Sequence, residues 1–407
     1  MREGEREHSL GFLRGNMAVM IATGALWQFA GNAVWPFFSL YVLALGGSPE
    51  MIGIINGVGT LASILPTVVG GYFADVYGRK KLTAFFSVVL GFTSLLMAMA
   101  LDWRMLLAAV VVDSLAAGFR EPAMSALIAD SLSPESRGIG FAAWAIIPTV
   151  PSLISPMIAG YLIDAHGTLL VLKWGYALTG IAALTAGICR YMFLRETVLP
   201  RTAGKSISTM TRTIASTHRL MSRNLWILLL GESLIWLGWS VASPYFILYG
   251  TSGSVGLTTT EWGIVLLVSS SARVLGFALG SLADRYGRRN MTIATLLLTS
   301  ASSFFFLQSK TLSQVALVFT IYSVSILVAQ QLSQALRADV CPTENRSRVY
   351  SFFIIWQYIT RTVGSVLGGF LYVSVSMSMP FHFQALAALV CAVILVSSMA
   401  ETARRQK

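Results

Sequence analysis

Apolar residues run along this chain in long blocks, and short clusters of charged residues separate the blocks. Blocks of about 20 apolar residues predict membrane-spanning helices, because a helix that rises about 1.5 Å per residue needs that length to cross about 30 Å of hydrocarbon. The pattern therefore predicts an all-α integral membrane protein with twelve transmembrane helices. The predicted spans are residues 16–44, 50–74, 82–101, 104–129, 139–164, 169–192, 224–249, 261–282, 291–308, 311–337, 349–375 and 380–400.

The composition supports this class of protein. Hydrophobic residues make up 55% of the 407 residues and charged residues only 12%, whereas a soluble domain carries about 25% charged residues. The three cysteines show neither a pairing pattern nor a metal-ligand spacing, so we expect no disulfide and no metal. Residues 203–206 resemble the end of a phosphate loop, but that motif needs a glycine where Leu199 stands. We therefore expect no bound nucleotide and no other cofactor.

The positive charge lies in alternate loops. A formal net charge of +11 would suggest a nucleic-acid partner in a soluble protein, but this distribution is the one expected of cytoplasmic loops. We therefore expect no nucleic-acid partner, and we place both termini in the cytoplasm, in a multi-pass protein of the cell (plasma or inner) membrane. The predicted inner segments hold Arg2, Arg6, Arg14, Arg79, Lys80, Lys81, Arg137, Arg285, Arg288, Arg289, Arg346, Arg348, Arg404, Arg405 and Lys407, and the predicted outer loops hold Arg104, Lys173 and Lys310.

Residues 193–223 form the longest polar stretch, and they divide the spans six and six. We interpret this stretch as a cytoplasmic linker that lies on anionic lipid headgroups. It would join an N-terminal six-helix bundle, residues 1–192, to a C-terminal six-helix bundle, residues 224–407.

A ten-residue pattern occurs twice, after the second and the eighth spans. Residues 71–80 read Gly-Tyr-Phe-Ala-Asp-Val-Tyr-Gly-Arg-Lys, and residues 280–289 read Gly-Ser-Leu-Ala-Asp-Arg-Tyr-Gly-Arg-Arg. The same offset of 209 residues relates Asp130 to Asp339. Two six-helix halves related in this way predict a parallel pseudo-repeat, as in transporters that rock one half against the other.

At these residues the chain resembles the major facilitator superfamily (MFS). Its most specific signature, Gly-x-x-x-Asp-x-x-Gly-Arg-(Lys/Arg) between spans two and three, occurs here in both halves, and the resemblance covers essentially the whole chain. The resemblance implies a secondary transporter, rather than an enzyme, that works by alternating access and closes its cytoplasmic side with this loop. The residues assigned to the cytoplasmic gate are Gly71, Asp75, Gly78, Arg79, Lys80, Gly280, Asp284, Gly287, Arg288, Arg289, Asp130 and Asp339.

The residue types of the repeated loop suit such a gate. Gly78 and Gly287 permit a left-handed turn just past a helix end, and we expect the basic residues after them among lipid headgroups. A carboxylate at the C-terminal end of a helix is unfavourable alone, so Asp75 and Asp284 each need an Arg or the N-terminus of another helix.

Family resemblance also suggests where those partners lie. It implies that Asp75 meets the start of span eleven, near residues 347–350, and that Asp284 meets residues 136–138 by the repeat. The alternative is a basic loop that only sets the topology.

Ionisable side chains at membrane depth are costly, so each is a functional candidate. Asp113 and Arg120 are seven residues apart on one helix face, whereas Glu121 faces about 100° away from Arg120. The resemblance places spans one, four, seven and ten around a central cavity. The predicted substrate and proton cavity comprises Gln28, Asn32, Asp113, Arg120, Glu121, Glu232, Trp236, Gln330, Gln334, Trp356 and Arg361. The alternative is structural: Arg120 pairs with an acid of its own bundle, the amides join helices, and the tryptophans lie at membrane interfaces.

Three functions fit these features. The leading interpretation is proton-coupled export of amphiphilic compounds, as in multidrug efflux. A buried carboxylate would be the proton carrier, because no histidine lies deep within a predicted span. The alternative is an uptake symporter for a sugar or an organic anion, held by Arg120, Arg273 or Arg361. A membrane receptor or sensor with this fold is the competing class. We expect a monomer whose partners are a small-molecule substrate, protons and the lipid bilayer.

Overall fold

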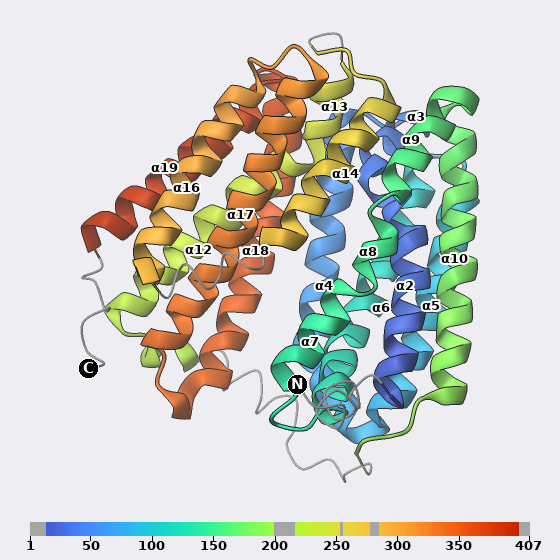
Figure 1. Cartoon of the computed structure of the whole chain (residues 1–407), viewed down its shortest axis with the longest axis vertical. Coiled ribbons are helices and arrows are strands. Elements are labelled where there is room, and N and C mark those ends of the chain that lie inside the picture. Colours follow the sequence, from blue (N-terminus) through green and yellow to red (C-terminus); the bar gives the residue numbers. More distant parts are fainter. Residues whose placement is uncertain (1–13, 199–215, 253–254, 277–284, 399–407) are drawn as a thin grey trace, which may run out of the picture. The chain divides into compact units, whose positions relative to one another are not determined.

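The computed structural model describes residues 14–198, 216–252, 255–276 and 285–398, and it is helical with no strand in that part of the chain (Figure 1). Within the described residues, every predicted span coincides with a long helix or with a run of shorter ones, so the predicted all-helical membrane fold is confirmed. The first half contains α2 (Asn16–Asn32), α3 (Phe38–Ala44), α4 (Pro49–Tyr77), α5 (Arg79–Ala98), α6 (Trp103–Asp130), α7 (Arg137–Ile146), α8 (Thr149–Ser152), α9 (Ser155–His166) and α10 (Thr168–Phe193). The second half contains α12 (Arg223–Ala242), α13 (Phe246–Thr251), α14 (Thr259–Gly276), α16 (Arg288–Phe306), α17 (Leu312–Val340), α18 (Arg346–Ser374) and α19 (Met379–Ser398).

The first span of each half is broken at the same place. A 3₁₀ turn, η2 (Trp35–Phe37), separates α2 from α3, and η4 (Ser243–Tyr245) separates α12 from α13. The second residue of each turn is a proline, Pro36 or Pro244. Proline has no N–H to donate and so interrupts a helix. The repeat seen in the loops therefore extends to the backbone of the spans.

Eight helical segments among the described residues are long and apolar enough to cross a membrane by length and composition alone. The helices α6, α14, α16 and α18 correspond to predicted spans but fall outside that set. Charge explains part of the difference, because α6 alone carries Arg104, Asp113, Arg120, Glu121 and Asp130. Spans that carry charge at depth are those expected to hold functional side chains.

Contacts divide the chain into two compact units. The first comprises Met1–Gly46 and Ala62–Ser206, and the second comprises Gly47–Leu61 and Ile207–Lys407. The first turns of α4 thus cluster with the second unit, where a Cβ atom on Gly57 would lie 3.2 Å from the carbonyl oxygen of Thr362 in α18. The division into bundles at residues 193–223 remains a proposal.

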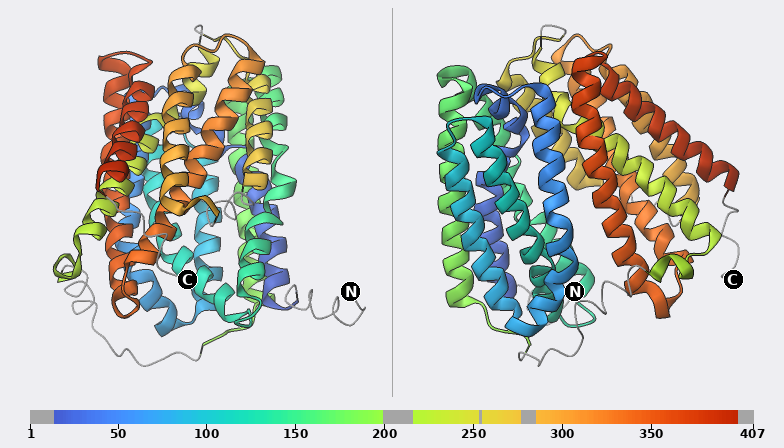
Figure 2. Two further views of the ribbon diagram at one scale, coloured as in Figure 1. Left: turned by 60° about the vertical axis from the view of Figure 1, so that its left-hand side comes forward. Right: turned by 180° about the vertical axis from the view of Figure 1, so that it is seen from behind.

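Glycines let the helices approach closely within each unit; Figure 2 shows the helices of each unit from two further sides. In the first unit α5 packs along α10, and a Cβ atom on Gly180 would lie 2.9 Å from the carbonyl oxygen of Gly91. In the second unit α12 packs against α18 and α19, and a Cβ atom on Gly364 would lie 2.7 Å from the carbonyl oxygen of Leu237. Small residues at such crossings are typical of membrane helices, whose association depends on close packing.

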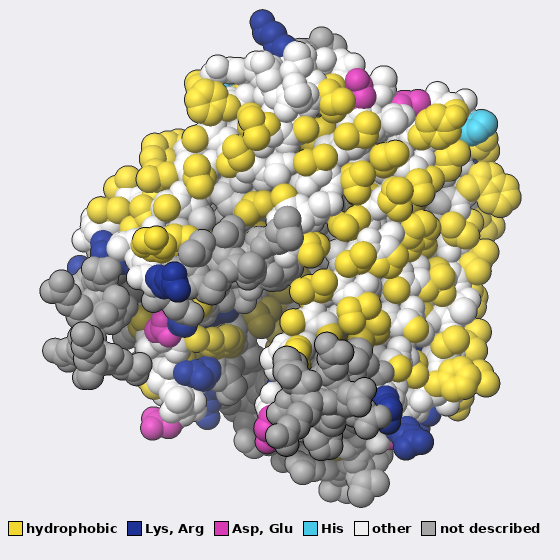
Figure 3. All heavy atoms as spheres, viewed as in Figure 1, with side chains coloured by type: hydrophobic (Ala, Val, Ile, Leu, Met, Phe, Trp, Pro, Cys, Tyr) yellow, Lys and Arg dark blue, Asp and Glu magenta, His cyan; other side chains and the backbone are white. Residues whose placement is uncertain are grey.

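Large apolar side chains remain on the outside of both units. Figure 3 shows hydrophobic side chains spread along the helices on one face, with charged side chains gathered toward the ends. Trp174 is 71% exposed and Tyr191 is 64% exposed. Lipid tails solvate such a surface at no cost, so these side chains face the bilayer.

Candidate functional site

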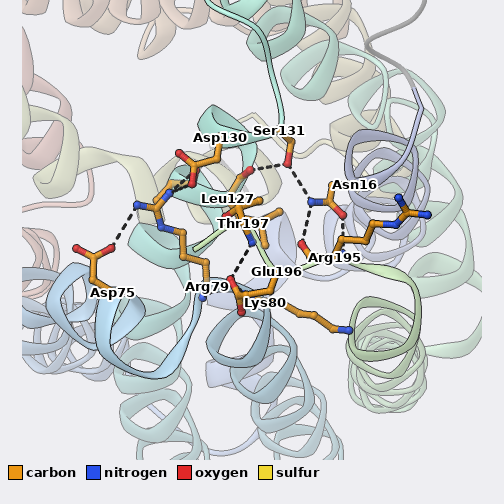
Figure 4. A network of polar contacts seen from close by, with 11 residues as sticks. Asn16, Asp75, Arg79, Lys80, Leu127, Asp130, Ser131, Arg195, Glu196 and Thr197 are labelled. Atoms are coloured by element: carbon orange, nitrogen blue, oxygen red, sulfur yellow. Dashed lines mark hydrogen bonds and ion pairs between the residues drawn. The ribbon is translucent and has the colours of Figure 1, made fainter. Parts of the chain in front are cut away.

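The first copy of the repeated loop joins α4 to α5 through Gly78. This glycine has φ +96° and ψ 138°. The positive φ is one that other residues rarely adopt, as expected of this glycine, but the ψ value differs from that of the predicted left-handed turn. Arg79 follows at the first position of α5 and reaches two carboxylates (Figure 4). Its guanidinium lies 3.2 Å from Asp75 and also donates to Asp130 at the end of α6. The loop is thereby tied to α4 and to α6.

The sequence placed Arg79 and Lys80 among lipid headgroups, and the structure gives both side chains protein partners. Arg79 is only 16% exposed because Asp75 and Asp130 converge on it. The Lys80 ammonium lies 5.6 Å from the centre of the Tyr191 ring on α10. The i, i+4 spacing of Asp75 and Arg79 accounts for one of these contacts. The others depend on tertiary packing.

Glu196, which the sequence analysis did not single out, completes the network (Figure 4). Its carboxylate accepts the backbone N–H groups of Arg79 at 3.0 Å and Lys80 at 3.1 Å, which are free donors at the start of α5. The start of α2 also holds this segment, because the side chain of Asn16 accepts from the N–H of Arg195 at 2.7 Å. A carboxylate at a helix N-terminus is favourable, so Glu196 fastens the chain after α10 to the repeated loop.

The second copy of the loop repeats part of this geometry. Gly287 has φ +85° and ψ 129°, close to the values of Gly78. Arg288 begins α16 with two hydrogen bonds to Asp339, at 2.8 and 2.9 Å. Arg289 donates to the carbonyl oxygens of Leu395 and Val396 near the end of α19, at 3.0 and 2.7 Å.

Two predicted gate residues of this copy, Gly280 and Asp284, lie outside the described residues. In the first copy, a Cβ atom on Gly71 would meet nothing within 4 Å. The partners that we expected for the two aspartates across the loop, at residues 347–350 and 136–138, stay predictions.

In the first unit the charged side chains of α6 have partners inside their own bundle, as in the structural alternative for Arg120. Asp113 and Arg120 share a helix face, but Asp113 accepts a hydrogen bond from Thr93 at 2.6 Å. Arg120 instead pairs with the adjacent Glu121. The 100° angle between the two Cα–Cβ directions did not prevent contact, because both side chains are long enough to bend toward each other. The Arg120 guanidinium also lies 4.1 Å from the centre of the Trp27 ring.

The two amides predicted from span one join helices. Gln28 accepts from the Thr149 hydroxyl at 3.1 Å, and Asn32 donates to Ser152 at 2.8 Å. Both partners belong to the short helix α8, where the predicted span five is broken. These contacts favour the structural interpretation for Gln28 and Asn32.

Arg190 is a buried arginine that the sequence analysis missed. It is 2% exposed and donates to the hydroxyls of Thr23, at 3.0 Å, and Ser87, at 2.7 Å. Its position three residues before the end of α10 suggested a side chain that extends to the membrane surface. The two hydroxyl acceptors hold it inside the bundle instead.

The second unit contains a buried ion pair. Glu232 on α12 and Arg337 on α17 lie 3.2 Å apart and are 6% and 5% exposed. The rings of Tyr350 and Phe353 flank the Arg337 guanidinium at 4.4 and 4.8 Å. Only one Glu232 oxygen is bonded, and the other, Oε1, is buried without a hydrogen-bond partner. Arg337 was also missed, because it ends a predicted span.

Arg361 lies halfway along α18 and has no acid beside it among the described residues. The rings of Trp236, Trp239 and Tyr358 surround its guanidinium, with ring centres 5.6, 5.3 and 5.6 Å away. An arginine near the middle of a membrane helix costs about 2.5–3.5 kcal/mol. Such a residue therefore needs a compensating interaction or a function.

The remaining predicted cavity residues lie on α17 and α18. The side chains of Gln330 and Gln334 make no hydrogen bond to a described residue, and they are one helical turn apart. Trp356 is 41% exposed. These groups are available for contact with a solute.

Comparison with known proteins agrees with this architecture. The model of the Major Facilitator Superfamily matches residues 20–278 and 228–407. An uncharacterised MFS-type transporter of Methanocaldococcus jannaschii, MJ1560, is 22% identical over 95% of this chain and 98% of its own length. The multi-drug resistance efflux pump PmrA homolog of Lactococcus lactis is 25% identical over 67% of each chain. Among solved structures, a point mutant of the nucleoside transporter NupG aligns with a TM-score of 0.77 at 12% identity, over 95% of this chain and 100% of its own.

The doubled loop, its two arginine–aspartate pairs and the paired breaks in the first spans now have one explanation. The family match covers most of the chain, and its members are transporters rather than enzymes. This chain belongs to the Major Facilitator Superfamily and is a membrane transporter.

Proposed function

We propose that this transporter exports amphiphilic small molecules across the cell membrane in exchange for protons, by alternating access. Both termini lie in the cytoplasm in this proposal, and the monomer is the working unit. The observation that carries the proton coupling is the buried Glu232–Arg337 pair with its unbonded carboxylate oxygen.

The coupling step follows from the chemistry of that pair. Two opposite charges buried together stabilise each other, and removal of one charge leaves the other uncompensated. A proton that binds Oε1 of Glu232 neutralises the carboxylate and weakens its attraction for Arg337. The protonated and deprotonated forms therefore favour different packings of α12 against α17. Release of the same proton on the other side of the membrane completes the exchange.

Export of amphiphiles is supported by the side chains near this pair and by the relatives. Trp236 and Trp239 present aromatic rings on α12, and Trp356 is partly exposed on α18. Aromatic surfaces with a few polar groups are typical of sites for amphiphilic ligands. The Lactococcus lactis relative is named as a multi-drug efflux pump.

The cytoplasmic gate is part of this proposal. Arg79 holds Asp75 and Asp130 together, and Arg288 binds Asp339. The Arg79 pairs hold the first loop to α4 and α6, and Asp75 is exposed enough to engage another element. An uptake symporter for a sugar or an organic anion is the second candidate. The Arg361 cation suits an anionic solute in either direction of transport, so it favours the organic-anion form of this candidate.

Transport by the purified protein in liposomes tests the proposal. A panel of cationic, neutral and anionic amphiphiles, a sugar and a nucleoside would be assayed with and without an imposed pH gradient. In vesicles whose transporters expose their cytoplasmic side to the outside, we expect an acidic vesicle interior to drive at least one amphiphile inward. Sugar uptake coupled to protons, without amphiphile transport, would support the second candidate instead. No gradient-dependent transport of any solute would contradict both.

A further inference from the structure

Arg361 carries five N–H donors at the centre of a membrane span, and none of them binds a described residue. Its Nε is buried without a partner, whereas its terminal nitrogens are not fully enclosed because the side chain is only partly buried. Three aromatic rings occupy its surroundings, at 5.3 to 5.6 Å from the guanidinium carbon. The rings can stabilise the charge through their faces, but they accept no strong hydrogen bond in the plane of the guanidinium.

Three arginines of the described residues are more deeply buried than Arg361, and each of them has an acceptor. Arg120 binds Glu121, Arg190 binds two hydroxyls, and Arg337 binds Glu232. Arg361 differs from all three. A charged group within the membrane is unfavourable without a partner, and a bound anion would give Arg361 the acceptor that no described residue supplies.

The close packing of α18 against α12 positions the aromatic rings around Arg361. Gly364 and Gly368, one and two turns beyond Arg361, bring α18 against the backbone of α12 at Leu237 and Val241. This contact sets Trp236 and Trp239 of α12 beside Arg361, and Tyr358 lies one turn before Arg361 on the same helix face. The Arg361 site, formed by Arg361, Trp236, Trp239 and Tyr358, is therefore preorganised.

We propose that the Arg361 site binds the carboxylate of an aromatic organic anion, so that the exported amphiphiles are anionic. A planar guanidinium fork matches a carboxylate through two parallel hydrogen bonds. The surrounding rings offer apolar contact to a flat hydrocarbon body attached to that carboxylate. This inference rests on the proposed function, because it assigns the substrate class of the same transporter.

Direct binding to the full-length purified protein tests this assignment without any gradient. Tritiated 1-naphthoate serves as the anionic probe, and 1-naphthamide and 1-naphthylmethylammonium compete as neutral and cationic probes with the same ring. We expect saturable binding of tritiated naphthoate that unlabelled naphthoate displaces. The amide and the amine should compete at least about tenfold less well. Equal displacement by all three compounds would overturn the proposal, because it would show that the site recognises the aromatic ring and not the negative charge.

Three variants test whether Arg361 is the residue that binds the naphthoate carboxylate. Arg361→Gln should weaken naphthoate binding by about tenfold or more, since charge-assisted hydrogen bonds are the stronger kind. Arg361→Lys keeps the charge but loses the planar fork of donors, so its naphthoate affinity should lie between those of the wild type and Arg361→Gln. It serves as the test if Arg361→Gln does not fold. Arg104→Gln is the matched control, because Arg104 also lies over a tryptophan ring, at 5.3 Å, but at the start of α6. Wild-type affinity in both Arg361 variants would overturn the proposal.

The outcomes separate this inference from the export proposal. Naphthoate that binds through Arg361 but is never moved by a pH gradient supports the Arg361 site and contradicts export. Cationic amphiphiles that are exported while naphthoate does not bind support export and contradict the Arg361 site.

Discussion

Arg288 and Asp339 form a double hydrogen bond between the start of α16 and the end of α17, at 2.8 and 2.9 Å. Arg79 and Asp130 form the equivalent pair in the first half, and both pairs span 51 residues. The family signature covers only the loop between two helices and the arginine that follows it. The aspartate that binds this arginine lies at the end of the next helix, α6 in the first half and α17 in the second. The repeated unit is therefore a loop together with the end of the next helix.

Asp75→Asn should shift the conformational equilibrium without unfolding the loop. Arg79 keeps Asp130 as a partner in this variant, and Asp75 is 56% exposed, so we expect a loss of only about 0–1 kcal/mol in unfolding free energy. If Asp75 also holds the cytoplasmic side closed, its loss favours the inward-open state, and a shift of about 1.4 kcal/mol changes that population about tenfold. Labelling of cysteines placed on the inner ends of α4 and α18 would measure it.

The background for that labelling is clear from the structure. Cys341 is 4% exposed, and burial raises the pKa of its thiol, so it should react slowly with maleimides. Cys391 is fully buried, which leaves Cys189 as the cysteine to replace first. Unchanged labelling and unchanged transport in Asp75→Asn would mean that the loop only sets the topology.

Gly78→Ala should destabilise the protein more than Gly167→Ala. Both glycines precede a helix with positive φ, +96° and +87°, so each alanine carries strain of about 1–3 kcal/mol. Only at Gly78 would the new Cβ atom also approach the Glu196 carboxylate, to 2.5 Å; at Gly167 it meets nothing within 4 Å. Thermal unfolding of the two variants would compare them. Equal losses of stability would show that Glu196 does not hold the loop in the membrane-embedded protein.

Gly368→Ala should force α12 and α18 apart. Its Cβ atom would lie 3.0 Å from Cα of Val241, and overpacking of this kind typically costs about 1–3 kcal/mol. Gly231→Ala is the control on α12 itself, where the nearest atom, Cys391 Sγ, would be 3.4 Å away. We expect a lower melting temperature and weaker naphthoate binding for Gly368→Ala alone. A tolerated Gly368→Ala would contradict the close packing that positions the Arg361 site.

Much of this architecture could be predicted from sequence because it depends on local patterns. Apolar blocks predict spans through their length alone, and a glycine followed by basic residues at a helix end predicts a turn. The duplication of the loop at a fixed offset predicted that Asp130 and Asp339 would share a role, and each indeed pairs with the arginine of its own half.

Partner choice could not be predicted, because it depends on tertiary approach and on side-chain length. Arg120 pairs with its neighbour Glu121 although the two residues point in different directions on an ideal helix. Arg190, Glu196 and Arg337 lie at or near the ends of predicted spans, where the sequence suggests contact with water or headgroups. Their acceptors and donors come from helices more than 100 residues away in the chain.

The orientation in the membrane is testable through Asn345. This residue ends a 3₁₀ turn just before α18 and begins an Asn-Arg-Ser sequence that can accept a glycan. The basic loops place it in the cytoplasm, so we expect no glycan in a microsomal translation assay, and a cytoplasmic signal from a reporter fused at the C-terminus. Glycan attachment at Asn345 would reverse the proposed topology.

Proton movement driven by the substrate tests the central claim most directly. Vesicles that contain the transporter and an internal pH dye would receive a transported amphiphile without any imposed gradient. We expect wild-type protein to move protons against the substrate flux. Glu232→Gln should abolish this proton signal but keep downhill substrate exchange. If this single variant is unstable, the double variant Glu232→Gln, Arg337→Gln, which removes both buried charges, replaces it in the test. Substrate-driven proton movement equal to wild type in the Glu232 variants would contradict coupling through the Glu232–Arg337 pair.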